Sequence, residues 1–159
     1  MSTPASIKKH PVHPMLVTLP IGLWVFSLIC DFAFKIWGGQ SWEIVARYTM
    51  GGGIAGALLA AVPGMIDYKA MRDPHVTKIA TAHMTINLIA VALYAVNLWM
   101  RIRNADVDLL PPVPFALSII AVLLIGVSGW LGGTMVYKHG VGVEPQHDTP
   151  EEAHAKDRI

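Results

Sequence analysis

The chain has 159 residues, of which 53% are hydrophobic and only 14% are charged, and its formal net charge is +1. Soluble domains carry about 25% charged residues, so this composition, with a mean hydropathy of +0.49, argues against a soluble globular domain. The near-neutral charge gives no indication of nucleic-acid binding, and the single cysteine, Cys30, excludes an intramolecular disulfide and a thiolate metal cluster within one chain.

Four long apolar runs dominate the sequence. Each approaches the roughly 20 residues that a helix needs to cross about 30 Å of hydrocarbon, and a backbone in lipid must satisfy its own hydrogen bonds, which a helix does. We therefore predict an all-α protein, an integral membrane four-helix bundle with both termini on the same side. The predicted spans are residues 15–37, 48–66, 79–100 and 114–136.

The first run follows Lys8 and Lys9, which resemble the basic start of a signal peptide. Residues 15–37 are longer than the 7–15 apolar residues of a signal peptide, and no small-residue cleavage site follows. We expect a retained helix.

Short polar connections join the runs. In "RDPH", Asp73 suits an N-cap and Pro74 the first helical turn. Residues 1–143 form the predicted transmembrane domain, and residues 144–159 are a polar, proline-broken tail with the composition of a disordered segment. The side of the membrane that is richer in lysine and arginine is usually cytoplasmic. Six such residues flank the helices on the side of the termini and four on the opposite side, which favours cytoplasmic termini: Lys8, Lys9, Lys69, Arg72, Lys78 and Lys138, against Lys35, Arg47, Arg101 and Arg103.

Small residues recur at a spacing of four in the second and fourth runs. The pairs are Gly52 and Gly56, Ala60 and Gly64, and Gly129 and Gly133. Such faces let helices approach closely in lipid, and we interpret them as packing surfaces within the bundle. The sequence also leaves a homo-oligomer possible.

A weak internal repeat accompanies these faces. His13 and His83 are 70 residues apart, as are Met65 and Met135. This offset suggests two similar helical hairpins related by an axis along the membrane normal.

Histidines gather on the terminal side of the predicted bundle. His83 lies inside the third run, with Asn87 one turn further on the same face, and polar side chains at such depth are costly and face the bundle interior. A hydrogen bond between helices would also explain His83. The predicted layer of polar residues comprises His10, His13, Asp67, His83 and His139.

Each remaining member of the layer has a structural alternative. Asp67 could pair with Lys69 or Arg72 at a helix end, and His139 could sit at a helix C-terminus capped by Gly140. His10 and His13 each precede a proline and could form a turn. Outside the layer, Asp31 is interpreted as an interfacial ion pair with Lys35, Arg47 or Arg101.

The chain resembles the bacterial four-helix membrane family called domain of unknown function 2231. The resemblance rests on "HPVHPMLVTLPIGLW", "GGGIAGALLAAVPGMIDYKAM", "AHMTIN" and "GWLGGTMVYKHGVGV", and extends from about His10 to Val143. It implies a multi-pass protein of the bacterial inner membrane and no established activity, and it directs attention to His10, His13, Asp67, His83 and residues 129–133. Some relatives are joined to a Rieske-type domain, which implies redox company; this chain lacks the cysteines for one, so such a partner would be a separate redox protein.

Three hypotheses follow from the histidine layer. The first is a small b-type cytochrome or haem-binding electron-transfer subunit, with His13 and His83 as axial ligands, His10 or His139 as substitutes and Asn87 nearby. The apolar runs place His13 about 9 Å from the depth of His83, which is a difficulty for one haem. The second is a non-haem metal site of His10, His13, Asp67 and His83. The third is a non-catalytic membrane scaffold. We see no nucleophile–base pair or phosphate loop, so a stand-alone enzyme is not favoured.

Overall fold

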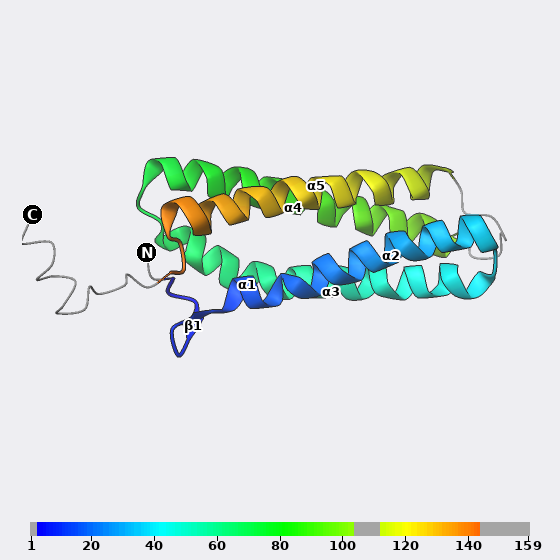
Figure 1. Cartoon of the computed structure of the whole chain (residues 1–159), viewed down its shortest axis with the longest axis horizontal. Helices are drawn as coiled ribbons and strands as arrows, with labels where there is room; N and C mark the ends of the chain where they lie inside the picture. The colour runs from blue at the N-terminus through cyan, green and yellow to red at the C-terminus, as the bar shows by residue number, and fades with distance from the viewer. Residues whose placement is uncertain (1–2, 104–111, 144–159) are drawn as a thin grey trace, which may run out of the picture.

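The computed structural model describes residues 3–103 and 112–143, and the predicted polar tail lies outside this range. Four long helices run side by side, which confirms the all-α prediction (Figure 1). A short helix leads into the first of them, and a small antiparallel hairpin precedes it. The elements are β1 (Ser6–Ile7), β2 (His10–Pro11), α1 (Val12–Leu16), α2 (Thr18–Trp37), α3 (Gln40–Ala70), α4 (Pro74–Arg103) and α5 (Pro112–His139).

All four long helical segments are long and apolar enough to cross a membrane. They extend beyond the apolar runs of the sequence: α3 begins at Gln40 and not at residue 48, and α4 begins at Pro74 and not at residue 79. Helical hydrogen bonding continues through polar residues at both ends, because the headgroup layers extend beyond the hydrocarbon core.

Burial in this bundle is opposite to that of a soluble protein. Large apolar side chains face outward, with Ile29, Leu59 and Leu123 each more than half exposed. The buried side chains include charged and polar ones: Ser27, Asp31, Asn97, Arg101, Ser118 and Ser128. Polar groups within membrane helices face the bundle interior, so the chain is an integral membrane protein.

The helices pack as two hairpins. Helix α2 lies along α3 and α4 along α5, while α3 also contacts α4 and α2 contacts α5. Side chains of α2 and α4 therefore meet across the interior. At its centre the rings of Trp24 and Tyr94 stack, with centroids 4.4 Å apart and planes at 8°. Met50, Ala90, Ala121 and Ile125 complete this core.

The start of α1, the connection between α3 and α4, and the end of α5 lie together at one end of the bundle, here called the terminal end (Figure 1). Asp73 caps α4 there, because its Oδ1 accepts the backbone N–H groups of His75 and Val76 at 2.8 and 3.3 Å. Helix α5 ends at His139, and Gly140 takes a φ of +62° after it. Both predicted caps are confirmed. The opposite end is called the far end.

Candidate functional site

His13 is fixed against helix α3 at the terminal end. Its Nδ1 lies 2.8 Å from the backbone oxygen of Ala60. A carbonyl oxygen can only accept, so Nδ1 carries the proton, and Nε2 of the neutral ring is left with its lone pair. A Cβ on Gly64, one turn further along α3, would lie 2.7 Å from this Nδ1. Only glycine leaves room for the ring at that position.

His83 has the corresponding arrangement on the other hairpin. Its Nδ1 lies 2.9 Å from the backbone oxygen of Ser128 in α5, and Ser128 Oγ is 2.9 Å from the same nitrogen. Gly132, one turn after Ser128, faces the ring, and a Cβ there would lie 3.4 Å from its Cε1. On the other side of the ring, Asn87 donates from Nδ2 to Nε2 at 3.0 Å.

The two imidazoles meet in the interior. Their centroids are 6.2 Å apart and their planes are at 84°. The depth difference expected from the apolar runs does not keep them apart, because helix α1 already begins at Val12 and carries His13 within the helical segment. The structure thus brings His13, His83 and Asn87 together.

Three other predicted residues make different contacts. His10 is exposed, and its Nδ1 donates to the backbone oxygen of Lys8 in the hairpin at 3.0 Å. Asp67 Oδ1 accepts the backbone N–H of Ala5 at 2.9 Å. The ring of His139 lies 5.4 Å from that of His75, at the surface of the terminal end.

The proposed layer is therefore divided between the His13–His83 pair and three residues that make separate contacts. Within residues 3–103 and 112–143, no three His, Cys, Asp or Glu side chains are placed to hold one metal ion together. The partners predicted for Asp67 were wrong: in this part of the chain neither Lys69 nor Arg72 forms an ion pair with it.

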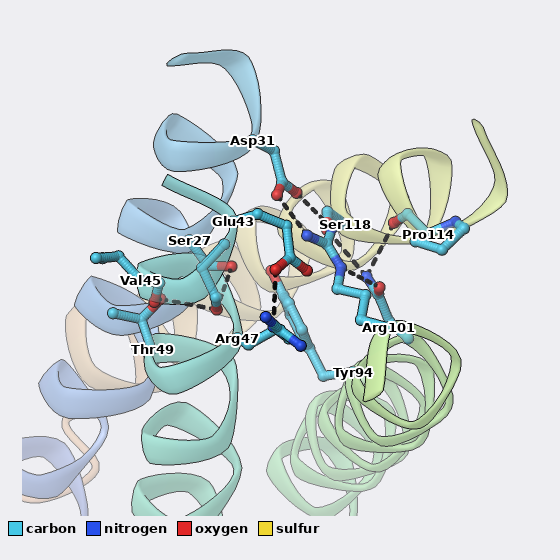
Figure 2. Close-up of polar contacts among 12 residues, drawn as sticks. Ser27, Asp31, Glu43, Val45, Arg47, Thr49, Tyr94, Arg101, Pro114 and Ser118 are labelled. Atoms are coloured by element: carbon cyan, nitrogen blue, oxygen red, sulfur yellow. Dashed lines mark hydrogen bonds and ion pairs between the residues drawn. The ribbon is translucent and has the colours of Figure 1, made fainter. Parts of the chain in front are cut away.

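A second polar cluster occupies the interior of the far end (Figure 2). Asp31 and Arg101 form a bidentate pair, with both oxygen–nitrogen distances at 2.7 Å and both side chains 1% exposed. The prediction of an interfacial ion pair named Arg101 among three partners, and the structure confirms Arg101 as the partner of Asp31. The sequence did not predict that the pair is buried, which follows because α2 and α4 turn both charges inward.

Neutral groups complete the hydrogen bonding of this ion pair. Asn97 accepts from Arg101 Nε at 2.9 Å and donates to the backbone oxygen of Pro114 and to Ser118 Oγ, both at 2.9 Å. Among the described residues, every buried side-chain nitrogen and oxygen atom has a hydrogen-bond partner. Sequence reasoning missed Asn97 and Ser118, although a polar residue inside an apolar run was a usable signal.

The internal repeat relates these sites. Three pairs with the 70-residue offset contact each other: His13 and His83, Trp24 and Tyr94, and Asp31 and Arg101. A residue that touches its own equivalent lies beside a pseudo-two-fold axis, and α2 and α4 run in the same direction along it (Figure 1).

The sequence offset that relates equivalent residues of α3 and α5 is not 70 residues. Ala60 and Ser128 play the same part toward the two histidines, and they are 68 residues apart. The suggested pair of Met65 and Met135 is therefore out of register: Met65 is 41% exposed, whereas Met135 is buried at 8%.

These features define the class: a membrane-spanning four-helix bundle of two pseudo-symmetric hairpins, with an interior histidine pair and a buried ion pair. The family model described as "Predicted membrane protein (DUF2231)" matches residues 9–145, so the chain belongs to this family, as the sequence motifs suggested. No curated protein and no solved structure matches it.

Proposed function

We propose that this protein is a small electron-transfer subunit of the membrane, in which His13 and His83 hold a metal-containing cofactor with haem b as the first candidate. The observation that carries the proposal is the hydrogen bond from each Nδ1 to a backbone oxygen, 2.8 Å for His13 and 2.9 Å for His83. This bond fixes the ring and its tautomer and leaves the lone pair on Nε2, which is the arrangement that metal-bound histidines use.

The donor set fits such a group. The ring centroids of His13 and His83 are 6.2 Å apart, and with metal–nitrogen distances of about 2.0–2.1 Å both imidazoles would be within reach of one metal ion. Nε2 of His13 has no hydrogen-bond partner among the described residues, whereas Nε2 of His83 accepts from Asn87. His83 could ligate the group through Nε2 only without the hydrogen bond from Asn87. A bound haem would supply one-electron exchange.

Absorbance and metal analysis of one purified preparation test this proposal. After expression with ample haem, the expected result is a Soret band that is lost in His13→Ala and in His83→Ala. His10→Ala is the matched control, because that ring is exposed and makes only a local contact within the hairpin. Stoichiometric zinc or iron without a Soret band would indicate that the same two histidines hold a non-haem metal ion and not haem. If the unsubstituted protein shows neither a Soret band nor stoichiometric metal, the cofactor proposal is overturned.

A scaffold role is the second candidate, and the amide of Asn87 on Nε2 of His83 favours it. In that role the two histidines connect α1 to α3 and α4 to α5 and bind nothing else. His13→Ala and His83→Ala would then lower the melting temperature of the purified protein without releasing any bound species.

We further propose that the protein lies in the bacterial inner membrane with the terminal end in the cytoplasm, where a separate redox protein could reach the histidine pair. The excess of lysine and arginine at the terminal end supports this orientation. Reporter fusions at the connection between α3 and α4 test it: alkaline phosphatase should be inactive there and a cytoplasmic reporter active. The reverse pattern would overturn the orientation.

A further inference from the structure

The hairpin before α1 has an unusual turn. Ile7 pairs with His10 across two residues, Lys8 and Lys9, whose φ angles are +48° and +71°. Asn, Asp and Gly dominate such left-handed turns, because a Cβ makes this conformation costly. Strain of this kind persists where the surrounding structure enforces it, and it is concentrated at functional sites.

The bundle holds this strained hairpin in place. Asp67 of α3, only 8% exposed, uses Oδ1 to accept the backbone N–H of Ala5 at 2.9 Å. Val12 in turn donates to the backbone oxygen of Ala5 at 3.0 Å. A nearly buried carboxylate is thus used to fix the position of the hairpin relative to α3.

The hairpin presents cations beside an apolar side chain. Lys8 and Lys9 are exposed at its tip, and Ile7 is 68% exposed next to them. The hairpin projects sideways from the terminal end, next to the start of α1 (Figure 1). The hairpin directly precedes the first candidate membrane span, Val12–Trp37. A segment at that place would lie in the headgroup layer, where a lysine can meet phosphate and an isoleucine the acyl boundary.

Among the described residues, the charges of the two ends differ in a way that leaves the terminal end positive. At the far end each described cation is engaged: Arg101 with Asp31, Arg47 with Glu43, and Lys35 and Arg103 over aromatic rings. At the terminal end, five cations have no carboxylate partner among the described residues: Lys8, Lys69, Arg72, Lys78 and Lys138.

We propose that the Lys8–Lys9 turn is a binding site for the phosphate group of an anionic phospholipid, with Ile7 inserted at the acyl boundary. Lys8 is exposed at the tip of the strained turn, and the hydrogen bond from Ala5 to Asp67 fixes the hairpin against the end of α3. The exposed Ile7 favours a lipid over a soluble phosphate, because an apolar side chain gains nothing from a small anion in water. This site is separate from the histidine pair and does not depend on the proposed function.

Lipid titration of the purified full-length protein tests the site, read by native mass spectrometry in detergent with phosphatidylglycerol or phosphatidylcholine. Phosphatidylglycerol should bind more tightly, and Lys8→Gln should weaken its binding about fivefold, as expected for one lysine near an anionic surface. Lys8→Gly should weaken binding equally but raise the melting temperature in lipid-free detergent, since glycine relieves the left-handed strain. These opposite signs separate lost binding from lost folding.

Lys78→Gln is the matched control, because Lys78 is an exposed cation at the same end but lies on α4, outside the hairpin. It should retain the phosphatidylglycerol preference. An equal loss in Lys78→Gln would mean diffuse surface charge and would overturn the site. Equal affinity for phosphatidylcholine would also overturn it, and so would full competition by inorganic phosphate, which would indicate a site for a soluble anion.

Discussion

At each end of the pseudo-two-fold axis two equivalent polar residues meet, and the two ends differ in which residues these are. At the terminal end the residue that meets its equivalent is histidine on both helices, and at the far end it is Asp31 facing Arg101. Identical charged residues cannot meet on such an axis in lipid, because they repel each other at low dielectric. Equivalent residues that meet on the axis must therefore be neutral or differ from each other. His13 and His83 can be neutral, and Asp31 and Arg101 are different residues of opposite charge.

Burial also differs between these two contacts. The histidines are partly exposed, and each is bonded to a backbone oxygen on a neighbouring helix. Asp31 and Arg101 are sealed in the interior and bonded to each other. We infer that the terminal contact is open to a ligand, whereas the far-end contact sets the register of α2 and α4.

The largest effect should come from breaking the far-end contact. Asp31→Ala leaves Arg101 buried without a counter-charge, and removal of one partner of a buried pair costs about 3–5 kcal/mol. Denaturant unfolding in detergent measures it. Lys35→Ala, one turn away, is the control and should cost far less, because the Lys35 ammonium lies over the Phe115 ring and forms no ion pair among the described residues. Equal losses in the two variants would show that Asp31 does not stabilise the interior.

Asn97 should come next in size. Asn97→Leu removes the acceptor of Arg101 Nε and the donor to the Pro114 backbone oxygen, and unpaired buried groups of this kind cost about 3 kcal/mol together. The matched control is Ser27→Ala, at the equivalent position of α2, which loses only one bond to the backbone oxygen of Ala46. A smaller loss for Asn97→Leu than for Ser27→Ala would contradict this account.

The two histidine contacts should differ in how closely they are packed. Gly64→Ala should cost about 2 kcal/mol through overpacking, because its Cβ would lie 2.7 Å from the ring of His13, whereas Gly132→Ala meets His83 at 3.4 Å and should cost less. Gly129→Ala, with no atom within 4 Å, is the control. Thermal unfolding should show the largest loss of stability for Gly64→Ala, a smaller one for Gly132→Ala and the smallest for Gly129→Ala. A greater loss for Gly132→Ala than for Gly64→Ala would contradict this difference in packing.

The smallest effect concerns Asp73, at the surface of the terminal end. The backbone N–H groups of His75 and Val76 hold the pKa of Asp73 below its ordinary value of 3.8. A lowered pKa in the folded state means that its stabilisation is present above pH 3.8 and is lost as the pH falls through the lower, folded value. Unfolding of the natural protein and of Asp73→Ala should therefore differ slightly at neutral pH and converge in acid. A difference that grows in acid would contradict the cap.

The candidate site was predictable only in part. His83 with Asn87 followed from polar residues four apart inside an apolar run, and the 70-residue offset in the sequence paired His83 with His13. His139 was assigned to the same layer, yet it meets His75, because the end of α5 lies beside the start of α4. Asp67 was expected to bind a cation and binds a backbone N–H, since the hairpin folds back over the end of α3.

By itself, the sequence determined the local and compositional features: four apolar helices, the caps at Asp73 and Gly140, and a membrane location. These depend on hydrophobic length and on residues near each other in the chain. Only the tertiary structure decided which side chains share the interior, because Asp31 and Arg101, 70 residues apart, become partners through the rotation and depth of two packed helices. Small shifts in where a helix begins, such as the start of α1 at Val12, decide those depths, and hydropathy does not encode them.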